Sequence, residues 1–120
     1  MPWDAVRTMC SDIASGMALA IITKFQELYR KKEIQKTQSC LGEMALNRFF
    51  EADVEKIIEE PTDVKKVMST TSERAHPTNI HFVILGKSIN GTPVYCKISM
   101  NHDLKTGVFI GWFMTSFKPE

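Results

Sequence analysis

The sequence lacks the features that mark several large classes of protein. Cysteine is scarce and odd in number, and Cys10, Cys40 and Cys96 lie far apart, which fits neither a disulfide framework nor a zinc site with paired ligands. The longest apolar stretch, Met17 to Ile22, is far shorter than the roughly 20 residues of a membrane span. We therefore predict free thiols in a reducing compartment, a cytoplasmic location, and no signal peptide or membrane anchor.

An excess of charge of one sign is also lacking. The chain has 15 Lys and Arg against 14 Asp and Glu, for a net charge of +1, so no overall field draws it to nucleic acid or to an anionic membrane. Residues 1–60 hold 8 basic and 10 acidic side chains, whereas residues 61–120 hold 7 and 4. Any basic binding surface must therefore be local, and the second half is the more basic one.

Motifs for cofactors are absent as well. The sequence has no Gly-rich phosphate loop, no paired cluster of metal ligands, no Gly-x-Ser-x-Gly elbow and no dinucleotide fingerprint. Its three histidines, His76, His81 and His102, do not have the spacing of a metal site. We expect neither a metal nor another cofactor.

What is present is the composition of one compact domain, residues 1–120, with 43% hydrophobic and 24% charged residues. Residues 1–61 show helical periodicity, and the first helix is expected to begin at a Ser11 cap. Its apolar stripe contains Ile13, Met17, Ile21, Phe25 and Leu28. A second helix is predicted after Ser39, with Leu41, Met44, Ala45 and Phe49 inward. A third is predicted from an Asp53 cap to Pro61, with Val54, Ile57 and Ile58 inward.

Residues 62–120 are rich in β-branched and aromatic side chains and predict four strands. These are Val64 to Thr70, Ile80 to Ile89, Thr92 to Met100 and Val108 to Phe117. A loop is expected between Ser69 and Asn79, and Asn90-Gly91 predicts a type I′ hairpin turn. The expected fold class is α+β, with N-terminal helices packed on one face of an antiparallel four-stranded β-meander.

The turn at Asn90-Gly91 sets an expected register, with Ile89 opposite Thr92. His81, Val83 and Leu85 then share an apolar, helix-facing side with Cys96, Ile98 and Met100. If Asp103 faces Val108, the opposite side carries Tyr95, Lys97, Ser99, Trp112 and Ser116. A bulge in that second hairpin would shift the register by one residue, so that Trp112 and Thr115 exchange faces. Rings, hydroxyls and a lysine on one uncovered face suit stacking on bases and contact with phosphates.

Cleavage of RNA by attack of the ribose 2′-OH needs no cofactor, only a base, a cation and an acid. The candidate catalytic residues are Lys97, Arg48, His81, His102 and Thr115. The candidate RNA-binding residues are Tyr95, Ser99, Trp112, Ser116 and Lys118. His81 or His102 would serve as base or acid, Lys97 and Arg48 would stabilise charge, and Thr115, Ser116 or Tyr95 would orient the phosphate or transfer a proton.

Each of these residues also has a structural interpretation. His102 is equally an exposed turn residue, and His81 a hydrogen-bonding residue near a strand end. The ammonium of Lys97 can reach water along the stem of its side chain. Arg48 can pair with Glu51 or Glu55.

Two stretches resemble a known group. Met44 to Phe49 and Ala52 to Pro61 resemble the helical start "His-Ala-x-x-Arg … acidic-Val-x-x-Val-Ile-x-x-Pro" of small domains related to the BrnT and RelE toxins. Pro93 to Ser99, Asp103 to Gly107 and Met114 to Pro119 resemble the final hairpin and tail of the same group, which unites barnase, EndoU, colicin and RelE-like ribonucleases. The resemblance spans residues 39–120. Where relatives often carry a histidine, this chain has Met44.

The resemblance implies a ribonuclease toxin that acts on tRNA or mRNA. It also implies a cognate antitoxin or immunity protein as partner, and in some relatives delivery as the C-terminal part of a secreted carrier. Because the histidine is replaced, activity would draw on Lys97, His81, His102 and the tail from Thr115 to Lys118.

A non-catalytic interaction module is the competing hypothesis, either immunity- or antitoxin-like or a cystatin-like α+β domain. In that case Tyr95, Trp112 and a strand edge would bind a partner protein. The near-neutral charge favours this alternative. A homodimer with a seam along the helix from Ser11 to Lys32 is compatible with either function.

Overall fold

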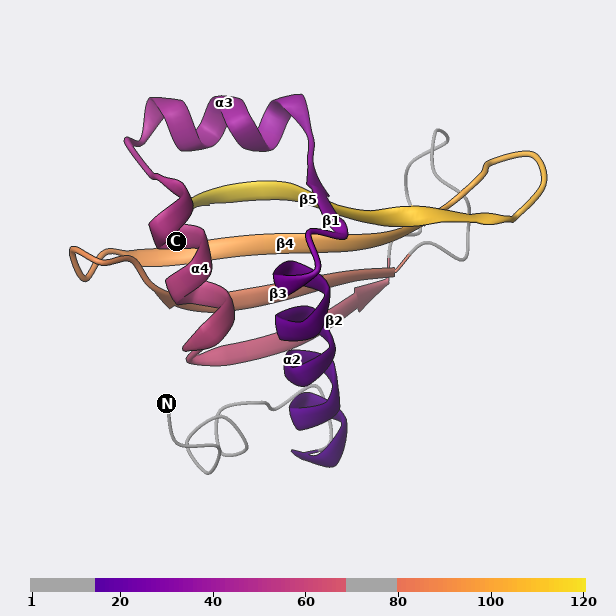
Figure 1. Ribbon diagram of the computed structural model, residues 1–120, viewed down its shortest axis with the longest axis horizontal. Helices are drawn as coiled ribbons and strands as arrows, with labels where there is room; N and C mark the ends of the chain where they lie inside the picture. The colour runs from indigo at the N-terminus through magenta and orange to yellow at the C-terminus, as the bar shows by residue number, and fades with distance from the viewer. Residues whose placement is uncertain (1–14, 69–79) are drawn as a thin grey trace.

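The computed structural model describes residues 15–68 and 80–120, which form three helices and a mixed five-stranded sheet (Figure 1). In chain order the elements are α2 (Ser15–Arg30), β1 (Ile34–Lys36), α3 (Gln38–Leu46), α4 (Glu51–Glu59), β2 (Asp63–Met68), β3 (Ile80–Lys87), β4 (Pro93–His102) and β5 (Phe109–Pro119). The predicted α+β class is confirmed. Cys10, the expected Ser11 cap, Ile13, His76 and the loop expected between Ser69 and Asn79 lie outside the described residues.

The sheet has the order β1-β5-β4-β3-β2. Strands β2 to β5 form the predicted antiparallel meander, but the prediction of four strands is wrong because β1 pairs parallel with β5, with Ile34 opposite Trp112. The backbone N–H of Thr37 continues this pairing by donating to Met114 O at 3.0 Å. A strand of three residues is too short to show an alternation of polar and apolar side chains.

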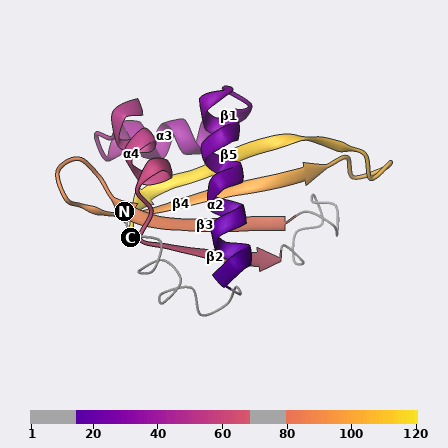
Figure 2. The ribbon, with the colours of Figure 1, turned by 60° about the horizontal axis from the view of Figure 1, so that its bottom comes forward.

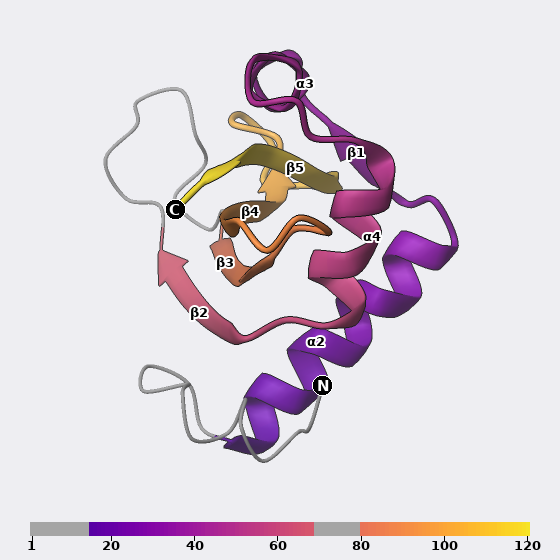
Figure 3. The same cartoon turned by 90° about the vertical axis from the view of Figure 1, so that its left-hand side faces the viewer.

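Helices α2 and α4 cover one face of the sheet, with α2 crossing the strands (Figure 2). Seen nearly along the strands, α3 lies beyond the β5 edge and not on that face (Figure 3). The core between the layers contains Ile22, Phe25 and Leu28 of α2, Val54, Ile57 and Ile58 of α4, and Phe82, Ile84, Cys96, Ile98 and Met114 of the sheet. We call the opposite side of the sheet, over which no described helix lies, the far face.

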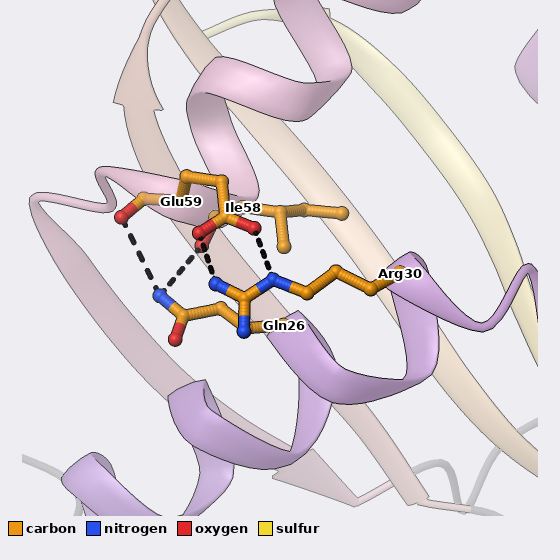
Figure 4. Close-up of polar contacts among 4 residues, drawn as sticks. All are labelled: Gln26, Arg30, Ile58 and Glu59. Carbon is orange, nitrogen blue, oxygen red and sulfur yellow. Dashed lines mark hydrogen bonds and ion pairs between the residues drawn. The ribbon is translucent and has the colours of Figure 1, made fainter.

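Helices α2 and α4 are joined by polar contacts at their C-terminal ends (Figure 4). The amide of Gln26, which is buried, donates to the carbonyls of Ile58 at 3.3 Å and Glu59 at 3.4 Å. The guanidinium of Arg30 donates to both carboxylate oxygens of Glu59, at 3.1 and 2.7 Å. The amide satisfies carbonyls that the last turn of a helix leaves without partners.

The second helix differs from the prediction in its start and in its inward face. Thr37, not Ser39, is the N-cap of α3, and its hydroxyl accepts from Cys40 N at 3.2 Å. Cys40 and Met44 are buried, whereas Leu41 and Ala45 are exposed. Phe49 lies beyond the helix, with its ring 5.2 Å from that of Phe117. A helix that covers an edge and not a face of the sheet has a narrower buried stripe.

The third helix follows the prediction at its buried face and at its end. Val54, Ile57 and Ile58 are buried, and the helix stops before Pro61. Its expected cap is wrong by three positions, because Phe50 is the N-cap. Asp53 instead accepts from Phe50 N at 2.9 Å and from Ile89 N at 3.0 Å, and so joins α4 to the β3–β4 turn.

The register of β3 and β4 differs by one residue from the expected one. Lys87 is opposite Pro93, and Ser88 N donates to Thr92 O at 2.9 Å. This closes a three-residue loop in which Gly91 has a φ of +85°, the arrangement of a type I turn followed by a bulge. Since one residue of slip inverts every side chain, Phe82 and Ile84 face the helices, whereas His81, Val83 and Leu85 lie on the far face.

Strand β5 contains two irregularities. Asp103 does face Val108, with Asp103 N donating to Val108 O at 2.8 Å. The pairing then shifts between Asn101 and His102 and again between Lys97 and Ile98. The first shift places Trp112 opposite Met100, on the helix side. The second shift leaves Thr115 without a directly opposed residue, between Met114 and Ser116.

Candidate functional site

The far face brings His81, Ser99 and Lys97 together. His81 and Ser99 are directly opposite each other on β3 and β4, and Lys97 is two residues along β4, opposite Val83. His81 Nδ1 and Ser99 Oγ form a hydrogen bond. Ser99 is fully buried, whereas His81 and Lys97 are partly exposed. A buried hydroxyl therefore fixes the orientation of a ring that water can reach.

The environment of His81 favours the neutral imidazole. Partial burial, and then the positive charge of Lys97, lower the pKa of His81 below its ordinary value of 6.5. Because Nδ1 is engaged with Ser99, Nε2 is the nitrogen that can exchange a proton with a ligand. A neutral histidine of this kind can act as a general base.

Lys97 supplies a cation beside that base. Its ammonium has no ion pair or hydrogen bond with any residue in the described parts of the chain, whereas its backbone carbonyl accepts from Thr115 Oγ1 at 3.5 Å. An unpaired ammonium on a partly exposed strand position can bind a phosphate. Thr115, another of the candidate residues, is thus next to Lys97.

A second group on the far face consists of Tyr95 and Lys118. The two residues are directly opposite on β4 and β5, and Lys118 Nζ lies 5.3 Å from the centre of the Tyr95 ring. This is the distance of a cation–π contact. An aromatic ring with a cation over it provides a stacking surface next to a phosphate contact.

Sequence reasoning missed two residues of this face. Lys65 on β2 is opposite Val83, which is opposite Lys97, so two lysines flank one valine across three strands. Phe113 on β5 is opposite Ser99 and takes the place that was expected for Trp112. Alternation within β2 could have indicated Lys65, but nothing in the sequence locates the bulge that turns Phe113 to this side.

Three candidate residues lie elsewhere. Arg48 is exposed in the turn between α3 and α4, with a φ of +57°, and has no described contact with Lys97. His102 is on the helix-side face of β4, with its ring 5.7 Å from that of Phe109. It is five residues from Lys97, which is about 17 Å along a strand. Trp112 packs edge-on against Phe25 at 5.5 Å.

Ser116 is opposite Lys97 but is used structurally. Its hydroxyl donates to Glu43 Oε1 at 2.8 Å, and the same oxygen accepts from Phe117 N at 3.4 Å. Glu43 of α3 therefore accepts hydrogen bonds from the outer edge of β5, at positions beyond the end of β1. Ser116 is buried by this contact, so its predicted role in binding RNA is not supported by its position.

A polar groove of about 490 Å³ lies on another part of the surface, between α2, β1 and α4. Glu51 is its central group, because it accepts from Lys36 Nζ at 2.6 Å and from Tyr29 Oη at 3.2 Å. Burial, and then Glu51, raise the pKa of Tyr29. The carboxylate at the centre of the groove is thus already engaged by the protein itself.

The described residues contain no group of three or more His, Cys, Asp or Glu side chains that could hold a metal ion. Cys40 and Cys96 are free and buried, and burial raises the pKa of the Cys40 thiol to about 11. No helix in residues 15–68 or 80–120 has the length and apolar character needed to cross a membrane.

No family model, no curated protein and no solved structure matches this chain.

Proposed function

We propose that this protein is a small metal-independent endoribonuclease that cleaves tRNA or mRNA through attack of the ribose 2′-OH, with the far face of the sheet as its substrate surface. The observation that carries the proposal is the contact of His81 with Ser99, two residues along β4 from Lys97, whose ammonium has no partner among the described residues. The resemblance of residues 39–120 to BrnT and RelE toxins supports the same function. It implies RNA as the substrate and a cognate antitoxin or immunity protein as the partner.

The roles follow from the chemistry of each group. His81 Nε2 accepts the proton of the 2′-OH while the 2′ oxygen forms a bond to phosphorus. Lys97 stabilises the negative charge that develops on the phosphate oxygens. The bond from phosphorus to the 5′ oxygen then breaks, and that oxygen takes a proton from solvent. Tyr95 and Phe113 provide rings on which bases stack, and Lys65 and Lys118 contact neighbouring phosphates.

The experiment is an incubation of the purified protein with total RNA in the presence of excess chelator. Wild-type protein is expected to give discrete products, and Lys97→Met and His81→Gln are expected to lower the cleavage rate by about 100-fold or more. Lys105→Met is the matched control, because Lys105 is exposed in the β4–β5 turn, and it should keep the wild-type rate. Melting temperatures are measured for all variants so that loss of folding is recognised.

Two outcomes would contradict the proposal. One is wild-type protein that leaves every RNA intact. The other is cleavage that persists at the same rate in both Lys97→Met and His81→Gln, since a contaminating nuclease would then be the source.

A protein-interaction module is the second candidate, and the edge position of β2 favours it. The sheet order ends at β2, and no described strand pairs with its outer side, so a partner strand can add there. Intact RNA together with a specific protein partner in a pull-down would support this function. The near-neutral net charge of +1 is compatible with it.

A further inference from the structure

The β4–β5 hairpin is a long arm that extends past the helices (Figure 1). Its end carries four large apolar side chains that water reaches. These are Leu104, Val108, Phe109 and Ile110, which are 50%, 61%, 47% and 56% exposed. No other described stretch of seven residues holds as many exposed large apolar side chains, and such a patch marks a contact surface more often than a solvated one.

An apolar pocket lies next to the base of this arm, on the helix side of the sheet. Its volume is about 180 Å³, and Ala20, Ile21, Lys24, Phe25, Phe82 and Trp112 line it. A cavity of about 150 Å³ accommodates a benzene ring, so the pocket can take one phenyl side chain. Phe109 adjoins it, because the Phe109 ring is 6.0 Å from that of Trp112.

We propose that a second copy of this chain occupies this surface, with Phe109 of each arm seated in the pocket of the other copy. A twofold interface needs one patch that is complementary to itself. The protruding ring and the pocket are neighbours on each chain, so a single twofold axis between them forms both contacts at once. The proposal is independent of whether the protein cleaves RNA.

The apolar area is of the size that a dimer needs. Four half-exposed side chains contribute on the order of 100 Å² each, or about 400 Å² in total. A standard interface buries about 800 Å² per partner, and in homodimers about 65% of it is apolar, which is roughly 500 Å². Because consecutive strand residues point to opposite faces, a second copy gains most of this area by contacting both faces of the arm as well as the rim of the pocket.

The interface differs from a seam along the first helix. The stripe of α2 that contains Ile22, Phe25 and Leu28 is buried against the chain's own sheet and α4. Ala20 and Lys24 lie beside that stripe and remain exposed. This border of α2 contributes one wall of the pocket.

The test is the mass of the purified protein in sedimentation at 1–100 μM, a range of about two decades around common dimer affinities. Wild-type protein is expected at twice the 13.6 kDa of one chain. Phe109→Asp removes the inserted ring, and Ala20→Phe fills the pocket from the protein's own helix. Each is expected to weaken dimerisation by at least 100-fold. Leu41→Asp is the matched control, since Leu41 is exposed to 46%, and it should stay dimeric.

A local readout comes from Trp112 in a Trp3→Phe background, where it is the only tryptophan. Its emission should shift to longer wavelength on dilution through the dissociation range, and should no longer depend on concentration in Phe109→Asp. A monomer at every concentration would overturn the proposal. So would a dimer that both Phe109→Asp and Ala20→Phe leave intact, because the contact would then lie elsewhere.

Discussion

His81 and Ser99 face each other across β3 and β4, and their side chains are hydrogen-bonded through Nδ1 and Oγ. Ser99 is fully buried, so its hydroxyl cannot exchange this partner for bulk water. Breaking the bond would leave a buried polar group unsatisfied, at a cost of about 1–3 kcal/mol. The ring is thereby held with Nε2 available to a ligand.

The titration of His81 tests this environment directly. Burial is the larger cause of its lowered pKa, and the charge of Lys97 is the smaller one. We expect Lys97→Met to raise the pKa of His81 while leaving it below 6.5, since burial is unchanged. The measurement is the NMR chemical shift of the imidazole between pH 4 and pH 8.

The same shift has a consequence for stability. Folding favours the neutral form of His81, so its contribution is present above pH 6.5 and is lost as the pH falls through the lower folded pKa. His81→Gln should therefore lose less stability than wild-type protein between pH 7 and pH 5. A titration midpoint above 6.5 in wild-type protein would contradict both expectations.

The sequence predicted the existence of most elements better than their register. The helical stripes and the four long strands are recognisable because each spans several periods. Asn90-Gly91, however, is compatible with two loops, since both the type I′ turn and the three-residue loop accept a glycine with positive φ. What selects between them is tertiary: Asp53 binds Ile89 N, and Gly86 lies under Ile57 of α4.

That one-residue difference determines the candidate site. In the expected register His81 would face the helices, away from Lys97, whereas the observed register places both on the far face. The two bulges of β5 have a similar effect on Trp112, Phe113 and Thr115. A bulge depends on packing across the sheet and leaves no mark on the sequence that alternation can detect.

Gly86→Ala tests the contact that selects the register. A Cβ at this position would lie 2.9 Å from Ile57 Cδ1, and Ile57 is fully buried. We expect a loss of about 1–3 kcal/mol in the free energy of unfolding, because the core must make room. Urea unfolding provides the measurement.

Ile57→Val is the matched second change, because it removes Cδ1 and by itself costs about 0.5–1.5 kcal/mol. In the Ile57→Val background, Gly86→Ala should cost clearly less than it does in wild-type protein. If the losses in the free energy of unfolding from the two changes simply add, a Cβ at position 86 does not press on Ile57 Cδ1. The contact between Gly86 and Ile57 would then not restrain the sheet.

The end of α2 provides a stabilising substitution. Lys32 has a φ of +59°, and the N–H groups of Lys32 and Glu33 donate to Tyr29 O and Leu28 O at 3.0 and 2.9 Å. This is the Schellman motif, in which glycine is usual. We expect Lys32→Gly to raise the free energy of unfolding by about 0.5–1 kcal/mol, since the left-handed conformation disfavours a side chain.

Lys24→Gly is the control for that substitution. Lys24 is exposed in the middle of α2, where glycine costs about 1 kcal/mol relative to good helix formers. In thermal unfolding, we expect Lys32→Gly to raise the melting temperature and Lys24→Gly to lower it. A loss of stability in Lys32→Gly would mean that the Lys32 side chain stabilises the fold by more than its left-handed backbone conformation destabilises it.

Gln26 and Arg30 both join α2 to α4 (Figure 4). Their contributions to stability differ because Gln26 is buried and Arg30 is exposed. The Gln26 amide is buried, and its loss in Gln26→Met leaves the carbonyls of Ile58 and Glu59 without that donor. The Arg30–Glu59 pair is solvated, with side-chain exposures of 62% and 30%. We expect Gln26→Met to cost about 1–3 kcal/mol and Arg30→Met less than about 1 kcal/mol.

Salt distinguishes the two contacts further. In 0.5 M NaCl, where screening extends over only about 4–5 Å, the effect of Arg30→Met should shrink, and that of Gln26→Met should not change. Urea unfolding of both variants at low and high salt measures this. If Arg30→Met proved the more damaging variant, the exposed ion pair and not the buried amide would be the main polar link between the helices.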